Sequence, residues 1–248
     1  MTTSKRHIIK PCNNVYKATT TMAIALTGII ALFILRSSRS KDITLAMSIF
    51  TFLLMAFYRT YLLFDEEYID IAYNGNLNIY NELLFYPCNI VVITYLIGLI
   101  GHLRPLIAFS FFYSICPIAA LLFPGEGFTN EPFFKPRVFF YYTSHYLIMM
   151  MMVFVVASDI YMPEFKDIIP SALLCLLFSF LAYLFNCFLI KTGLNLKANY
   201  FYNYDPDGNP LLESLYEHIP HPFLFTLPVV GLSIITSLIL VIITHLLV

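Results

Sequence analysis

The sequence is short of charged side chains. Aspartate, glutamate, lysine and arginine make up only 12% of its 248 residues, whereas about a quarter of an ordinary soluble domain is charged. Hydrophobic residues account for 59%, above the roughly one half that is typical of soluble domains. The shortage of charge excludes an ordinary water-soluble domain and predicts a protein whose solvent is lipid.

The sequence also lacks a surplus of positive charge, since its formal net charge is −1. A phosphate-binding surface needs such a surplus, so nucleic acid is excluded as a partner and membrane lipids are expected instead. Protein partners stay unknown. There is no Gly-rich phosphate loop, and His218 and His221 have no further ligands nearby. We therefore predict no cofactor and no metal.

The five cysteines fit no zinc or redox motif. Most of them lie in apolar runs, where a reduced thiol acts as a small hydrophobic group, so no disulfide framework is expected. They are Cys12, Cys88, Cys116, Cys175 and Cys187.

Seven apolar runs approach the length of about 20 residues that a membrane-spanning helix needs. They are too continuous for barrel strands, which alternate over about 10 residues. We predict an all-α polytopic membrane protein with a single transmembrane domain, residues 1–248, and a bundle of about seven helices. The predicted spans are residues 18–35, 43–64, 83–100, 103–123, 138–157, 168–190 and 223–248.

The connections between the spans differ on the two sides of the membrane. On the side of the N-terminus, here called the even side, they are long and polar: residues 65–82, 124–137 and 191–222. Long ordered loops usually carry function, so we expect the working face there. More lysines and arginines fall on the even side, including Lys5 and Arg6, which predicts a cytoplasmic N-terminus.

A cysteine and a histidine fall at similar depths below the even side. Cys88 is five residues into the span 83–100 and His145 is seven into the span 138–157. At about 1.5 Å per residue these positions are ~8 Å and ~10 Å deep. The same layer holds further polar groups that are candidates for binding or orienting a substrate: Arg59, Asn81, Glu82, Asn89 and Asn186.

Two interpretations of Cys88 and His145 stay open. An imidazole beside a thiol draws it towards thiolate, which attacks an acyl ester and forms a thioester, and Asn89 or Asn186 orients the imidazole or donates to the oxyanion. Alternatively, the cysteine only packs and the histidine makes an interhelical hydrogen bond. Cys116 is a rival nucleophile, although Pro117 beside it indicates a kink.

Arg59 also has two interpretations. It is a structural partner of Glu82 or of the acidic cluster 65–67, or it holds a lipid phosphate.

Three blocks of the sequence resemble a known family. They are residues 84–89 around Cys88, the pair Ser144 and His145, and residues 199–202 with 210–212 and Leu215. Their order and spacing are similar to those of the YwaF-like integral membrane family and its eukaryotic relative, the transmembrane protein 164 family. Asn199 and Tyr200 belong to the third block and join the candidate orienting residues.

The resemblance implies a multi-helix membrane fold. It also implies a lipid acyltransferase of the kind that makes arachidonoyl ether phospholipids through a cysteine acyl-enzyme and a histidine. By position these residues are Cys88 and His145. Tyr86 and Asn89 stand where relatives often carry histidine near the cysteine, so the resemblance does not extend to the exact substrate.

The predicted function is thus a membrane acyltransferase or acyl hydrolase acting on phospholipid acyl chains. An alternative is a small-solute transporter, or a transporter subunit, with its polar vestibule on the even side. A receptor or purely structural protein is a third class. The last span has no lysine for a retinal Schiff base.

Overall fold

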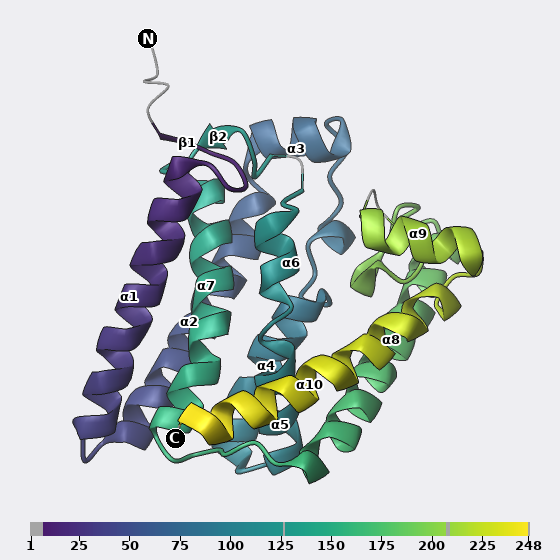
Figure 1. Cartoon of the computed structure of the whole chain (residues 1–248). Coiled ribbons are helices and arrows are strands. Elements are labelled where there is room, and N and C mark those ends of the chain that lie inside the picture. Colours follow the sequence, from purple (N-terminus) through teal and green to yellow (C-terminus); the bar gives the residue numbers. More distant parts are fainter. Residues whose placement is uncertain (1–6, 126, 207–208, 248) are drawn as a thin grey trace. The chain divides into compact units, whose positions relative to one another are not determined.

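The computed structural model describes residues 7–125, 127–206 and 209–247, and Figure 1 shows that they are mostly helical. The α-helices are α1 Asn14–Arg36, α2 Ser40–Leu62, α3 Glu66–Tyr73, α4 Pro87–Gly101, α5 Arg104–Tyr113, α6 Pro117–Leu122, α7 Pro136–Ala157, α8 Ile168–Lys191, α9 Pro210–His218 and α10 Leu227–Leu247. Within the described residues the only strands are β1 Ile8–Ile9 and β2 Glu131–Pro132, which pair antiparallel. The predicted all-α class is confirmed.

Membrane-crossing segments account for most of the helical residues. Six are long and apolar enough to span: Asn14–Arg36, Ser40–Leu62, Arg104–Leu122, Pro136–Ala157, Phe165–Lys191 and Leu224–Leu247. The seventh apolar helix, α4, has 15 residues. At about 1.5 Å per residue it covers ~22 Å, less than the roughly 30 Å of a hydrocarbon core. The chain is a multi-pass membrane protein whose third predicted span is shorter than expected.

The start of α4 explains that shortening. The predicted span began at residue 83, but the helix begins at Pro87, and Tyr86 is extended with φ −72° and ψ 151°. A residue that precedes proline is driven out of the helical region, whereas proline itself fits the first position of a helix.

The fourth predicted span, residues 103–123, is interrupted at its centre. Helix α5 ends at Tyr113 and α6 begins at Pro117. Proline has no N–H, and its ring would clash with the carbonyl four residues earlier, which here is that of Tyr113. The kink expected at Pro117 is confirmed.

The last predicted span, residues 223–248, matches the observed apolar segment Leu224–Leu247. A short 3₁₀ helix, Leu224–Thr226, precedes α10. Val248 lies outside the described residues, as do Lys5 and Arg6.

The chain forms two compact units, and the prediction of a single domain stays a prediction. Unit 1 comprises Met1–Leu77 and Ser114–Ile160. In this unit α7 packs against α1, α2 and α6. Hydroxyl groups join these helices, because Tyr146 Oη lies 2.8 Å from Thr20 Oγ1 and Tyr141 Oη donates to the Ala120 carbonyl at 2.6 Å. Such polar contacts hold helices together where lipid is as apolar as the side chains.

Unit 2 comprises Asn78–Tyr113 and Tyr161–Val248, and α5 packs in it against α4, α8 and α10. A Cβ added to Gly98 would lie 2.9 Å from Ile107 Cγ1, so only glycine permits this close approach of α4 and α5. Thr94 Oγ1 and Ser110 Oγ join the same two helices at 2.7 Å. Unit 2 therefore holds the short helix α4 firmly against α5.

An arginine ties the start of α5 to the segment before α8. Arg104 donates to both carboxylate oxygens of Asp167, at 3.0 and 2.7 Å, and to Glu164 at 2.6 Å. Tyr161 Oη donates to the same Asp167 carboxylate at 3.0 Å. Burial raises the pKa of Tyr161, and the charge of Asp167 raises it further, so this phenol stays a hydrogen-bond donor.

Candidate functional site

Cys88 is the second residue of α4 in unit 2. Pro87 precedes it, and the amides of Asn89 and Ile90 both donate to the Tyr86 carbonyl, at 3.0 and 3.1 Å. The thiol is half-buried. The first turn of a helix is the positive end of its dipole, which favours a negative group there. The sequence placed Cys88 five residues into a span that starts at residue 83. Because α4 begins at Pro87, Cys88 lies instead in the first turn of the helix.

Two asparagines predicted to assist Cys88 differ in their hydrogen bonding. Asn186 donates from Nδ2 to the Tyr200 carbonyl and to Asn203 Oδ1, both at 2.9 Å, and its Oδ1 accepts from the Tyr200 amide at 2.9 Å. Asn89 is 1% exposed, and its Oδ1 and Nδ2 have no hydrogen-bond partner among the residues that the structure describes. Asn186 is therefore a structural residue, whereas the side-chain amide of Asn89 is left unbonded by the described residues.

The segment before Cys88 is braced by the Asn-Tyr block. Tyr200 Oη donates to the Tyr80 carbonyl and accepts from the Leu83 amide at 3.3 Å. Its ring centroid lies 5.1 Å from that of Tyr86. Tyr200 thus positions the chain that leads into α4.

Three more candidate residues are neighbours in sequence of the residues in these contacts: Asn199, Asn81 and Glu82. Asn199 Oδ1 accepts from the amides of Tyr204 and Asp205, both at 3.1 Å, so it shapes its own loop. Asn81 and Glu82 are buried, and the Asn81 carbonyl accepts from Tyr86 Oη at 3.3 Å. These contacts indicate positioning of the segment before Cys88.

His145 is buried in the middle of α7 in unit 1. Its Nδ1 lies 2.6 Å from the Tyr141 carbonyl, which only accepts hydrogen bonds. Nδ1 therefore carries the proton, and Nε2 is the nitrogen with a lone pair that can act as a base.

Aromatic rings surround this histidine. The ring centroid of Tyr141 lies 4.4 Å from that of His145, and Phe128 stacks on Tyr141 at 4.4 Å. Tyr58 lies 6.4 Å from Tyr141, and the guanidinium of Arg59 lies 5.4 Å from the centre of the Tyr58 ring. Arg59 and His145 thus belong to one aromatic cluster of unit 1.

A charge cluster in unit 1 was missed by the sequence reasoning. Arg137 is fully buried and donates to Asp65 at 3.2 Å, Glu67 at 3.1 Å and Glu131 at 3.0 Å. Asp65 and Glu67 belong to the acidic cluster that was one of the alternatives for Arg59, and Arg137 pairs with both of them. The signal was present, because the acidic cluster and Arg137 fall on two even-side loops that are adjacent in the predicted topology.

Local geometry completes this cluster. Gly127 has φ +85°, a conformation that favours glycine, and its carbonyl accepts from Arg137 Nε at 2.9 Å. Lys135 adds a second cation, 2.5 Å from Glu67 and 3.1 Å from Glu131. Hydrogen bonds from Arg137 and then Lys135 lower the pKa of Glu67 to about 2.

The candidate residues divide between the two units. Unit 1 holds Arg59, His145 and the rival nucleophile Cys116, which precedes α6. Unit 2 holds Cys88, Asn81, Glu82, Asn89, Asn186, Asn199 and Tyr200. The pairing of Cys88 with His145 joins two units and stays a prediction.

The comparison with known families matches almost the whole chain. The model of the TMEM164 family covers residues 4–248. The chain belongs to the TMEM164 family. No curated protein matches it significantly, and neither does any solved structure.

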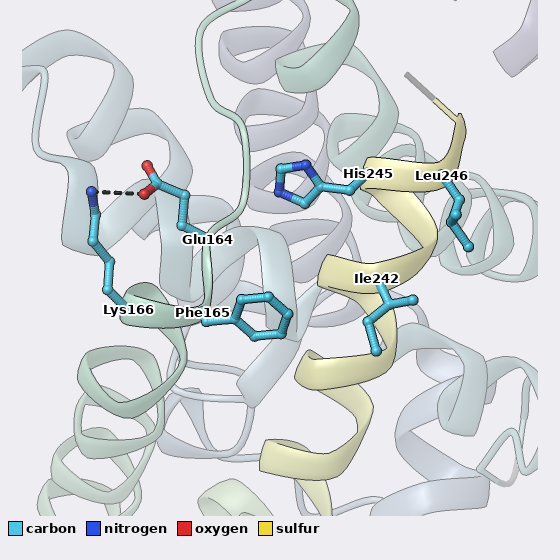
Figure 2. Close-up of a pocket in the computed structure, with 6 residues that line it drawn as sticks. All are labelled: Glu164, Phe165, Lys166, Ile242, His245 and Leu246. Carbon is cyan, nitrogen blue, oxygen red and sulfur yellow. Dashed lines mark ion pairs between the residues drawn. The ribbon is translucent and has the colours of Figure 1, made fainter.

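This TMEM164-family chain also has a groove of about 570 Å³ in unit 2 (Figure 2). The rings of Phe165 and His245 project into the space between the segment before α8 and the end of α10, while Glu164 and Lys166 form an ion pair of 2.8 Å beside it. The lining residues are Glu164, Phe165, Lys166, Ile242, His245 and Leu246. None of the predicted site residues lines this groove, so it is not the predicted active site.

The described part of this family member contains no group of three or more His, Cys, Asp or Glu residues placed to hold a metal ion. None of its five cysteines is in a disulfide. The candidate residues Cys88, His145 and Asn89 carry a thiol, an imidazole and an amide.

Proposed function

We propose that this TMEM164-family protein is a membrane acyltransferase or acyl hydrolase that acts on phospholipid acyl chains, with Cys88 as nucleophile and His145 as base. The main support is the position of Cys88 in the first turn of α4, where the helix dipole favours a thiolate. The tautomer of His145 supports the second role, because Nε2 is left to take a proton. The resemblance of the three sequence blocks points to the same chemistry.

The proposed reaction has two half-reactions. His145 Nε2 takes the proton of the Cys88 thiol, and the thiolate attacks the ester carbonyl carbon of a phospholipid. The ester C–O bond breaks, the leaving alkoxide takes the proton from the imidazolium, and a thioester remains on Cys88. His145 then deprotonates an acceptor hydroxyl, or water, which attacks the thioester, and the departing thiolate is reprotonated.

The test is the formation of the thioester. Purified protein is incubated with a phosphatidylcholine that carries an alkyne-labelled acyl chain. The wild type should acquire a hydroxylamine-sensitive label, and Cys88→Ala should not. Cys116→Ala is the matched control and should keep the label. A label that survives in Cys88→Ala, or disappears in Cys116→Ala, would contradict the assignment of the nucleophile.

The same experiment separates transfer from hydrolysis. When a lysophospholipid is added to the labelled protein, an acyltransferase moves the label to it, whereas a hydrolase releases free fatty acid. We propose transfer as the main reaction, with the N-terminus and the start of α4 on the cytoplasmic side.

A transporter is the second candidate function. The break between α5 and α6 at Pro117 favours it, because transporters bind substrates at interrupted helices. Uptake of a small solute by proteoliposomes, equal in the wild type and in Cys88→Ala, would support this alternative.

A further inference from the structure

Asn89 has the most unusual environment of the polar side chains of unit 2. Its carboxamide is 1% exposed, yet neither Oδ1 nor Nδ2 has a hydrogen-bond partner within the described residues. Burial of an amide without a partner is unfavourable, and native proteins avoid it except where a ligand or water completes the bonding. The chain therefore keeps a costly group at this position.

Other buried asparagines of the same unit show that the fold can satisfy such groups. Asn203 donates to the Ser179 carbonyl at 2.7 Å and accepts from Asn186 at 2.9 Å. Asn195 donates to the Tyr80 carbonyl at 3.2 Å and accepts from the Lys197 amide at 3.0 Å. Asn89 differs from these three residues because no described loop or helix supplies its partner.

The place of Asn89 indicates what completes its bonding. It follows Cys88 directly in the first turn of α4, and its own backbone amide is already bonded to Tyr86. The donor that Asn89 can offer beside the nucleophile is therefore its side-chain amide. Nδ2 of a carboxamide is suited to donate to a carbonyl oxygen, including one that becomes negative when the carbon is attacked.

We propose that Asn89 binds the carbonyl oxygen of the acyl ester in the lipid substrate. This inference rests on the proposed function and deepens it, because it assigns the recognition of an ester lipid to one residue. Nδ2 donates to the carbonyl oxygen of the bound ester and holds it through the attack. The ligand class is an acyl-ester lipid, and an ether lipid without this carbonyl lacks the recognised group.

The test measures binding without the reaction. Cys88→Ala protein in dodecyl maltoside is titrated with palmitoyl lysophosphatidylcholine or with its ether analogue, hexadecyl lysophosphatidylcholine, and the melting temperature is recorded. The ester lipid should raise the melting temperature more than the ether lipid does. The double variant Cys88→Ala/Asn89→Leu should respond equally to both lipids, and so should Cys88→Ala/Asn89→Asp at a pH where its carboxylate is ionised and has no donor.

The melting temperature without lipid gives the matched control. Asn89→Leu removes unpaired buried polar atoms at nearly constant volume, so the protein should melt at the same or a higher temperature. Asn186→Leu, which removes three bonded contacts, should melt lower. On the otherwise native protein, Asn89→Leu should slow formation of the acyl adduct by about 100-fold.

Two results would overturn the inference. One is a lipid response of the wrong kind: the ester lipid raises the melting temperature of Cys88→Ala no more than the ether lipid does, or the ester lipid still has the larger effect in the double variants. The other is a lower melting temperature of Asn89→Leu, which would make Asn89 a structural residue. The binding comparison uses proteins without Cys88, so a failure of the thioester proposal would leave the role of Asn89 to be decided separately.

Discussion

The imidazole Nδ1 of His145 lies 2.6 Å from the carbonyl oxygen of Tyr141, one turn earlier in α7. This contact makes Nδ1 the donor and leaves Nε2 as the basic nitrogen. A backbone carbonyl cannot change its role, so the tautomer of His145 is set by the helix itself. The same contact is what a purely structural histidine would make, and the first prediction separates the two roles.

His145→Asn should abolish catalysis while preserving the fold. The asparagine Nδ2 takes the place of Nδ1 and keeps a donor near the Tyr141 carbonyl, but no base remains. Acyl transfer should fall by about 100-fold or more, the usual contribution of a general base. The measurement compares transfer rates and melting temperatures of the wild type and the variant. Full activity in His145→Asn would leave only the structural role.

Loss of Arg137 should destabilise unit 1. Arg137→Met leaves the largely buried carboxylate of Asp65 without the Arg137 cation, whereas Lys135 still pairs with Glu67 and Glu131. Removing one partner of a buried ion pair costs about 3–5 kcal/mol. Thermal and denaturant unfolding of the purified protein measure this loss of stability. Lys166→Met is the control, since that side chain is 68% exposed and its ion pair should contribute about 0–1 kcal/mol. Equal stability of the two variants would contradict the structural role of Arg137.

The same cluster predicts a response to acid. Because hydrogen bonds from Arg137 and Lys135 lower the pKa of Glu67 to about 2, the folded state favours the ionised carboxylate. This stabilisation is present above about pH 4.3, the pKa of a glutamate in the unfolded chain, and it is lost as the pH falls towards 2. Melting curves of the wild type and of Glu67→Gln should differ at pH 7 and converge as the pH falls from about 4 to about 2. A difference that stays constant over this range would show that Glu67 does not titrate as expected.

The N-terminus should lie in the cytoplasm. Cys12 is exposed just before α1, and Ser38 is exposed just after it. A membrane-impermeant maleimide added to sealed, right-side-out cells should fail to label Cys12 but should label Ser38→Cys. Each label is measured in a variant whose other cysteines have been removed, so that the maleimide can react only at position 12 or only at position 38. Labelling of Cys12 alone would reverse the orientation.

Much of the helical architecture could be predicted because a membrane helix bonds its own backbone. The predicted span 138–157 matches α7 Pro136–Ala157, and 168–190 matches α8 Ile168–Lys191. The errors arose at prolines. Pro87 delays the start of α4, and Pro117 divides α5 from α6, because proline lacks an N–H and restricts the residues around it.

The partners of the polar side chains were harder to predict. Sequence spacing did not single out Arg137, the buried cation that pairs with Asp65 and Glu67. Asn89 and Asn186 were equivalent in sequence terms, yet one amide is fully bonded within the fold and the other is not. These differences depend on chain segments that are distant in sequence, such as residues 186 and 200, so residue spacing does not reveal them.

The sequence by itself determined that this protein is a polytopic helical membrane protein, because long apolar runs with few charges are stable only in lipid and only when each helix satisfies its own backbone. Only the tertiary structure decided which buried polar groups are paired within the described residues and which are not. The reason is physical: a buried hydrogen bond requires two groups within about 3 Å in a defined direction, and that proximity exists only after distant segments have packed together.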